Sequence, residues 1–273
     1  PWGAKDLLDT AGIRTSWGAV PCKDRVPDTD ATVVTRLRQA GAILLGKLAM
    51  VEFAGGLGYR WADASASGPG RNPWNPERWT GGSSSGAGAA VSAGLVGFAI
   101  GTETWGSILC PSAFCGITGL RPTYGRVSRA GAMVCSYSFD KIGPLARSAA
   151  DCRAILGAIA GPDPDDPTTS DEPLRLDRPR RTPSSVRAAL IPLDYSKHGE
   201  PESKQAFEDA VGALKGLGLR PENATLPDFP ASDMAGAIIT AEALSALENF
   251  FRDGRVKQLK DPDGPYQMEI AAP

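Results

Sequence analysis

Short apolar runs alternate with helical patterns along this chain, and this alternation limits its possible folds more than any other feature. Strands are predicted for the opening PWGAKDLLD and for apolar runs at 42–47, 95–102 and 186–192, of which 42–47 and 95–102 suit buried strands. Helices are predicted between and after these strands, at 30–40, 86–93, 203–217 and 237–251. Such alternation favours an α/β fold with a parallel or mixed sheet.

Two of the predicted helices have a clear apolar side. In the helix at 30–40, Asp30 is the expected N-cap and Gly41 the stop, and the apolar stripe is Val33, Val34 and Leu37. In the helix at 203–217, the apolar face consists of Phe207, Val211, Leu214 and Leu217. Residues 203–251 are also suited to present a helical face to a second subunit, but core packing explains the same pattern and is the favoured interpretation.

The chain is interpreted as one domain, 1–273, with three parts. Residues 1–160 hold the motifs described below, 161–183 form an exposed connection rich in Pro and Asp, and 184–273 add further α/β elements. Within the first part, 52–82 is rich in Gly, Pro, Asn and Trp and lacks periodicity. It is therefore expected to be a long ordered loop of the kind that carries function.

Composition excludes several classes of protein. Hydrophobic residues make up 42% and charged residues 22%, as in ordinary globular proteins, and the net charge of −2 implies neither a nucleic-acid nor a membrane partner. The five cysteines are irregularly spaced, which favours free thiols and a cytoplasmic location. The single histidine, His198, excludes an HExxH zinc site and lies in a polar, turn-like stretch that is a poor place for a catalytic base.

Two stretches rich in Gly and Ser carry the candidate chemistry. WTGGSSSGAGAAVSAG at 79–94 has small apolar residues after its serines, so it favours close packing over a flexible linker. Either a phosphate cradle or a catalytic loop fits this composition, but the GK[ST] ending of a Walker A loop is absent. In the second stretch, 101–125, Ser107 follows a predicted strand, where the N–H groups of 104–107 are placed to converge on an oxyanion.

Together the two stretches resemble a known family. GGSSSGAGAAVSAGLVGFAIGTETWGSILCPSAFCGITGLRPTYGRVS at 81–128 is similar to the signature of the amidase signature hydrolases. PWGAKDLLDTAGIRTSWG at 1–18, GAILLGKLAMVEFAGG at 41–56 and SFDKIGPLARSAADC at 138–152 extend the similarity to about residue 160. The resemblance implies a mixed sheet with helices on both faces.

The resemblance also implies a Ser–cis-Ser–Lys triad. By position, Ser107 is the nucleophile, Ser83 the bridging serine after a cis peptide, and Lys5 the base, while Lys47 is not a triad member. The backbone N–H groups of Thr104, Trp105, Gly106 and Ser107 would stabilise the oxyanion. Burial would lower the pKa of Lys5 enough for a neutral amine to replace the missing histidine.

This chain departs from the family pattern at three positions and in length. Glu103 replaces Asp and keeps the charge; Trp105 replaces Gly and is expected to narrow the acyl pocket; Leu109 replaces Arg, which weakly disfavours anionic substrates. The chain is also shorter than family members, so we expect it to be truncated at both ends.

The expected function is hydrolysis of a small-molecule amide to an acid and an amine or ammonia, without metal or cofactor. One alternative is the glutamine-hydrolysing A-type subunit of an amidotransferase, with a partner subunit. Another is a truncated, inactive scaffold. A homodimer is compatible with the first reading, and the sequence names no particular amide.

Overall fold

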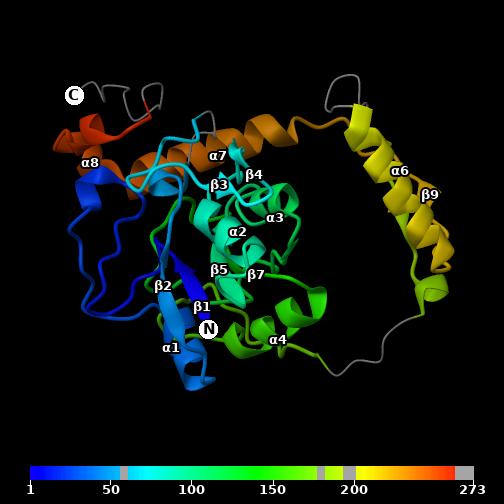
Figure 1. Cartoon of the computed structure of the whole chain (residues 1–273), viewed down its shortest axis with the longest axis horizontal. Coiled ribbons are helices and arrows are strands. Elements are labelled where there is room, and N and C mark those ends of the chain that lie inside the picture. Colours follow the sequence, from blue (N-terminus) through cyan, green and yellow to red (C-terminus); the bar gives the residue numbers. More distant parts are fainter. Residues whose placement is uncertain (56–60, 177–181, 193–200, 262–273) are drawn as a thin grey trace. The chain divides into compact units, whose positions relative to one another are not determined.

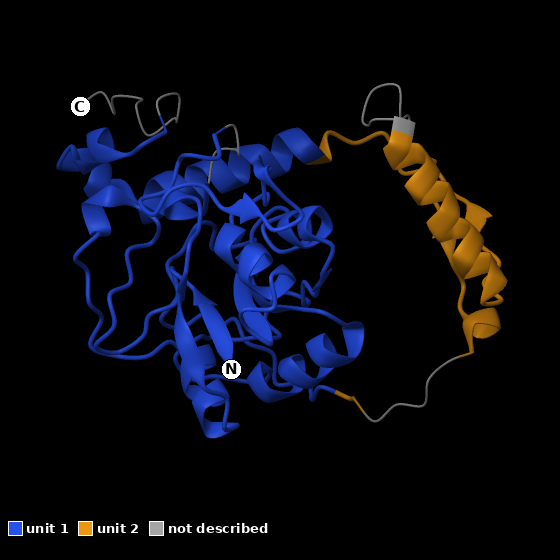
Figure 2. Ribbon diagram, in the orientation of Figure 1, with its two compact units in different colours: residues 1–174, 232–273 blue, residues 175–231 orange. Residues whose placement is uncertain are grey.

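The computed structural model describes residues 1–55, 61–176, 182–192 and 201–261. The chain divides into two compact units, one made of Pro1–Leu174 with Ser232–Pro273 and the other of Arg175–Ala231 (Figure 2). All the candidate triad and oxyanion residues belong to the first unit.

A five-stranded mixed sheet forms the centre of the first unit (Figure 1). Its strands are β1 (Trp2–Lys5), β2 (Leu44–Leu48), β5 (Phe98–Glu103), β6 (Thr118–Gly119) and β7 (Lys141–Ala146). Their order is β2-β1-β5-β7-β6, with β1 parallel to β2 and β5, and β7 antiparallel to β5 and β6. The predicted α/β class with a mixed sheet is confirmed.

Helices cover both faces of this sheet, because successive side chains of each strand point to opposite sides. Ala4, Ile100 and Ile142 share one hydrophobic cluster with α1 (Thr32–Gln39) and α4 (Ala149–Ile159). Ala99 and Leu145 share the other with α2 (Ser85–Ser92). The short helix α3 (Leu109–Cys115) packs against α2 on that second face.

The small residues of α2 let its backbone approach its neighbours closely. A Cβ added at Gly86 would lie 2.5 Å from the backbone nitrogen of Ala49, and one at Gly88 would lie 3.1 Å from Cys115 Sγ. The stretch at 79–94 is therefore tightly packed, as predicted, and is not a linker.

The predicted helix at 30–40 is α1, but its N-cap is not Asp30. The cap residue is Ala31, which has no side-chain cap. The Asp30 carboxylate instead accepts from the backbone N–H of Ala11 at 2.8 Å and pairs with Arg38, so it ties the loop before the helix to the helix itself. The apolar stripe of Val33, Val34 and Leu37 is buried as predicted.

The apolar run at 42–47 forms an edge strand, so the prediction of a buried strand is wrong. β2 is the first strand in the sheet order, and Ile43 and Leu45 are 67% and 59% exposed. Periodicity reports the strand itself, whereas its burial depends on neighbours that are distant in sequence.

Two other long segments are more structured than predicted. Within 52–82, η2 (Glu52–Gly55) and a short hairpin of β3 (Arg71–Asn72) and β4 (Asn75–Trp79) divide the expected loop. The helix predicted at 237–251 is two helices, α7 (Ala231–Ala246) and α8 (Glu248–Arg252), which meet at the buried Leu247. The remaining short helices of the first unit are η1 (Val20–Cys22) and η4 (Arg255–Gln258).

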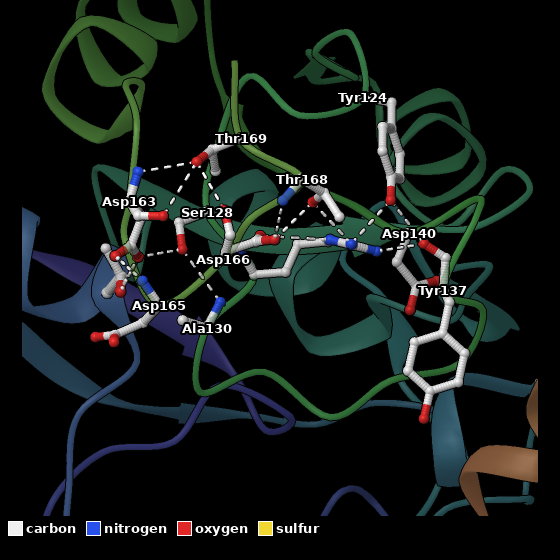
Figure 3. Close-up of polar contacts among 12 residues, drawn as sticks. Tyr124, Ser128, Ala130, Tyr137, Asp140, Asp163, Asp165, Asp166, Thr168 and Thr169 are labelled. Atoms are coloured by element: carbon white, nitrogen blue, oxygen red, sulfur yellow. Dashed lines mark hydrogen bonds and ion pairs between the residues drawn. The ribbon is translucent and has the colours of Figure 1, made fainter. Parts of the chain in front are cut away.

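Part of the expected exposed connection at 161–183 is anchored to the first unit. Asp163 and Asp166 are buried, and their carboxylates accept from Ser128 Oγ and, at 2.7 Å, from the backbone N–H of Arg129. The network continues from the Arg129 guanidinium, which donates to Tyr124 Oη and Thr168 Oγ1, each at 2.9 Å. Figure 3 shows Asp163, Asp166, Thr168 and Tyr124 within this network. Composition predicted exposure because Pro and Asp are usually solvated, but here the carboxylates have specific donors.

The second unit is small. Its helix α6 (Pro201–Gly216) confirms the helix predicted at 203–217, although Leu214 and Leu217 are exposed. The strand predicted at 186–192 is reduced to β8 (Ala189–Leu190), which pairs in parallel with β9 (Glu222–Asn223). The 3-10 helix η3 (Pro183–Ser185) precedes β8.

Candidate active site

Lys5 lies at the end of β1, the strand between β2 and β5, and its side chain is fully buried. Ala4 faces the cluster of α1 and α4, so the alternation of side chains directs Lys5 to the face covered by α2. At this end of the strand, Lys5 Nζ lies 2.7 Å from Ser83 Oγ and donates to Thr102 Oγ1 at 2.8 Å. Two of the three predicted triad residues are thus in direct contact, although they are 78 positions apart.

Burial changes the proton affinity of this amine. Loss of water around Lys5 lowers its pKa from 10.5 to about 7, and nearby Cys135, Asp140 and Glu103 offset only part of that effect. A lysine with a pKa of about 7 is largely neutral at pH 8. Its nitrogen lone pair is then available to accept a proton from a neighbouring hydroxyl.

Ser83 lies in the turn just before α2, and the Gly82–Ser83 peptide bond is cis, as the family resemblance implied. The next residue, Ser84, holds this turn against β5 because its hydroxyl donates to Thr102 O at 3.2 Å. A Cβ added at Gly101 would lie 2.8 Å from Ser84 Oγ, so only glycine leaves room for this contact.

Ser107 lies in the loop between β5 and α3 and is buried. Its carbonyl accepts the backbone N–H of Ser84 at 3.3 Å, which joins the loop of Ser107 to the turn of Ser83. Thr104, Trp105 and Gly106 precede Ser107 in this loop, and Gly106 adopts φ +93°, a conformation that side chains disfavour. The structure therefore places all six predicted site residues on two adjoining backbone segments and the end of β1.

Glu103, the last residue of β5, holds this loop in place through hydrogen bonds to its backbone. Its carboxylate, fully buried, accepts the backbone N–H groups of Ile108 and Leu109, both at 2.9 Å, and pairs with Arg121 at 3.3 Å. The sequence pattern pointed only to a charge at this position. The structure gives the reason for the charge: a carboxylate satisfies the free N–H groups where α3 begins.

Lys47 is separate from the site. It pairs in register with Ala4, not with Lys5, so its side chain points to the opposite face of the sheet. Its Nζ contacts Leu8 O and donates to Thr15 Oγ1 at 2.8 Å, and burial lowers its pKa to about 8. A lowered pKa alone therefore does not distinguish the two lysines, whereas the neighbouring hydroxyl does.

Sequence reasoning missed Asp140, whose carboxylate connects Thr104 of the predicted oxyanion loop to the backbone of Cys135 and Ser136. Asp140 accepts from the backbone N–H groups of Cys135 and Ser136 at 2.8 and 2.9 Å and from Thr104 Oγ1 at 2.5 Å. Its burial raises the pKa of its carboxyl group, and the hydrogen bond from Thr104 opposes that rise. An acidic residue directly before the apolar β7 was the available sequence signal. Thr102 Oγ1, the second partner of Lys5, had none.

A cavity of about 480 Å³ opens beside Thr104 and Trp105. The Trp105 side chain, expected to narrow an acyl pocket, lines this cavity and is 55% exposed. No group of His, Cys, Asp or Glu suited to a metal ion occurs among the residues that the structure describes. In that same part of the chain, no helix is long and apolar enough to span a membrane. His198 lies outside the described residues.

Comparison with known proteins gives one consistent result. The Amidase family model matches residues 1–270. Curated relatives include the A-type subunit of glutamyl-tRNA(Gln) amidotransferase from Roseiflexus sp. strain RS-1, 43% identical over 99% of this chain, and that from Moorella thermoacetica, 45% identical over 92%. The chain spans about half their length, 55% and 51% respectively.

Solved structures agree with these matches. Native peptide amidase from Stenotrophomonas maltophilia is 37% identical, with a TM-score of 0.81 over 93% of this chain and 54% of its own. The A-type subunit of glutamyl-tRNA(Gln) amidotransferase from Thermotoga maritima is 35% identical, with a TM-score of 0.83 over 94% of this chain and 57% of its own.

Proposed function

This chain belongs to the amidase family, and we propose that it hydrolyses the C–N bond of a small-molecule amide with Ser107 as nucleophile and Ser83 and Lys5 as a proton relay. One observation carries the proposal: a fully buried lysine, with its pKa lowered to about 7, lies 2.7 Å from a serine hydroxyl. A structural lysine gains nothing from such a position, because burial of an amine costs free energy.

The proposed reaction begins with two proton transfers. Neutral Lys5 Nζ takes the proton of Ser83 Oγ, Ser83 takes that of Ser107, and Ser107 Oγ attacks the amide carbon. The N–H groups of Thr104, Trp105, Gly106 and Ser107 stabilise the resulting oxyanion, each contributing about 3 kcal/mol.

The cycle ends with two bond cleavages. The C–N bond breaks as Ser83 returns a proton to the leaving amine or ammonia, and an acyl-Ser107 ester remains. Water then attacks this ester, the same relay carries its proton, and the acid leaves. No metal or organic cofactor takes part in the proposed scheme.

A fluorophosphonate probe tests this proposal without knowledge of the substrate, because it phosphonylates activated serines. Peptide mapping should find the adduct on Ser107 in the natural chain, none in Ser107→Ala and little in Ser83→Ala. Labelling of the folded chain at another serine, or at none, would contradict the proposal.

Hydrolysis of glutamine within an amidotransferase is the second candidate. The curated relatives favour it, because the A-type subunits of glutamyl-tRNA(Gln) amidotransferase account for matches of 43% and 45% identity. Glutaminase activity that rises when a co-purified partner protein is added would support this candidate, whereas equal turnover of simple amides without a partner would favour the first. The five free thiols fit the proposed cytoplasmic location.

A further inference from the structure

The cavity beside the proposed oxyanion loop has an unusual distribution of charge. Its lining combines the loop residues Thr104 and Trp105, the rings of Tyr124 and Phe139, and the side chains of Arg121 and Lys141. These last two are its only charged side chains among the described residues, and both are cationic.

The carboxylates of Glu103 and Asp140 already accept hydrogen bonds, and neither residue lines the cavity. Glu103 accepts two backbone N–H groups and pairs with Arg121, while Asp140 accepts two backbone N–H groups and the Thr104 hydroxyl. Neither carboxylate therefore faces a ligand in the cavity. The cavity wall has aromatic faces and positive charge, but no negative side chain.

Among the described residues, Lys141 is the cation of the cavity that forms no ion pair with a carboxylate. Its Nζ lies 3.4 Å from Thr104 O and 5.9 Å from the ring centre of Phe139, and within the described ranges no carboxylate pairs with it. Partial burial, together with the neighbouring charge of Arg121, lowers its pKa, and the charges of Glu103 and Asp140 offset part of that effect without pairing with Lys141. A desolvated ammonium without a counter-ion is unfavourable, so an anion placed in the cavity would relieve that cost.

From this geometry we infer that the cavity binds a carboxylate of the substrate, so that the amide cleaved carries a carboxylate a few bonds from the scissile carbon. The inference rests on the proposed function of Ser107. Thr104 and Ser107 are three residues apart, which keeps their Cα atoms within about 11 Å and limits the ligand to a short chain.

The same cavity disfavours an ammonium group, because two cations and no carboxylate line it in the described structure. A monoamide of a dicarboxylic acid therefore fits better than a zwitterionic amino-acid amide. The sequence comparison suggested that Leu109, in place of Arg, disfavours anions. Arg121 and Lys141 supply positive charge from other positions.

Binding tests the inference without turnover. Ser107→Ala serves as the host, so that glutaramate is not consumed, and the calorimetric titration is carried out at pH 6, on the acid side of the ordinary lysine pKa. Glutaramate should bind at least about tenfold more tightly than neutral glutaramide, since hydrogen bonds to charged groups are the stronger ones. Adding Lys141→Gln should remove this preference, whereas Lys141→Arg should keep it and Lys257→Gln, an exposed lysine elsewhere, should not affect it.

Equal affinities for glutaramate and glutaramide, no binding of either, or a preference that survives Lys141→Gln in a folded variant would overturn the inference. Turnover then separates it from the proposed function. A natural chain that labels at Ser107 and hydrolyses glutaramide as efficiently as glutaramate keeps the function but not the carboxylate site. A chain that binds glutaramate through Lys141 but fails to label at Ser107 keeps the site and loses the function.

Discussion

Replacing Lys5 by methionine should stabilise the fold at neutral pH while abolishing acylation of Ser107. Lys5 is fully buried, and burial lowers its pKa from 10.5 to about 7. Each unit of pKa corresponds to about 1.4 kcal/mol, so keeping this amine in the folded state costs roughly 5 kcal/mol at pH 7. Methionine fills a similar volume without that cost.

The substitution also removes three hydrogen bonds, those to Ser83 Oγ and Thr102 Oγ1 and a longer one to Thr102 O at 3.4 Å. Leaving two hydroxyls without this partner costs about 1–2 kcal/mol each, which reduces the expected net gain to roughly 1–3 kcal/mol at pH 7. The change of this stability difference with pH is the same whatever the lost hydrogen bonds cost. Between pH 7 and 10.5 the unfolded lysine holds a proton that the folded one has lost, so the natural chain gains about 1.4 kcal/mol of stability per pH unit relative to the variant.

Urea unfolding followed by tryptophan fluorescence measures this difference, because all six tryptophans lie in the first unit. The advantage of Lys5→Met should fall by roughly 2 kcal/mol from pH 7 to pH 9, less than two full units of slope because folded Lys5 is still half protonated at pH 7. Lys47→Met is the matched control: with a pKa of about 8, Lys47 contributes little slope between pH 7 and 8, where Lys5 already does. A stability difference that is the same at pH 7 and pH 9 would refute the assignment of a neutral buried Lys5.

Three other predictions follow from the site. Ser83→Ala should slow fluorophosphonate labelling of Ser107 by about 10²–10⁴-fold with an unchanged circular dichroism spectrum, because the proton relay is interrupted; unchanged labelling would remove Ser83 from the relay. The charge of Asp140 raises the pKa of Lys5, so Asp140→Asn should move the midpoint of the acylation pH profile, expected at pH about 7 in the natural chain, to lower pH; a midpoint that rises would contradict this coupling. Four thiols are buried and burial raises their pKa values: Cys22, Cys115, Cys135 and Cys152. Ellman's reagent at pH 7 should therefore modify at most Cys110 before the chain unfolds. Fast reaction of two or more thiols would be inconsistent with the packing.

The sequence predicted the fold class, the family and most individual elements, because these depend on local patterns. The stripe of Val33, Val34 and Leu37 is sufficient to place α1, and the family resemblance is confirmed by a family model that covers 1–270. Burial of whole elements was less predictable. The run at 42–47 reads as a buried strand, yet it lies at an edge, since the sheet order is decided by contacts distant in sequence.

The site shows the same division. Lys5, Ser83 and Ser107 were selected by resemblance, and the structure places Lys5 against Ser83, but their catalytic roles stay predictions. The supporting groups Thr102 and Asp140 were missed, because a threonine in a strand and an acid before a strand have many ordinary uses. Only the folded arrangement, in which Asp140 bonds Thr104 and Thr102 bonds Lys5, distinguishes them.

The position of β1 between β2 and β5 has a consequence for synthesis on the ribosome. β1 ends at Lys5 and β5 begins at Phe98, so 98 − 5 = 93 positions separate the lysine from the strand that completes its surroundings. At about 5–20 residues per second, Lys5 waits roughly 5–20 s in water, where its pKa is near 10.4 and it is charged. The nascent chain therefore carries an ordinary cation at this position, and a proton leaves it only when a much later strand docks beside it.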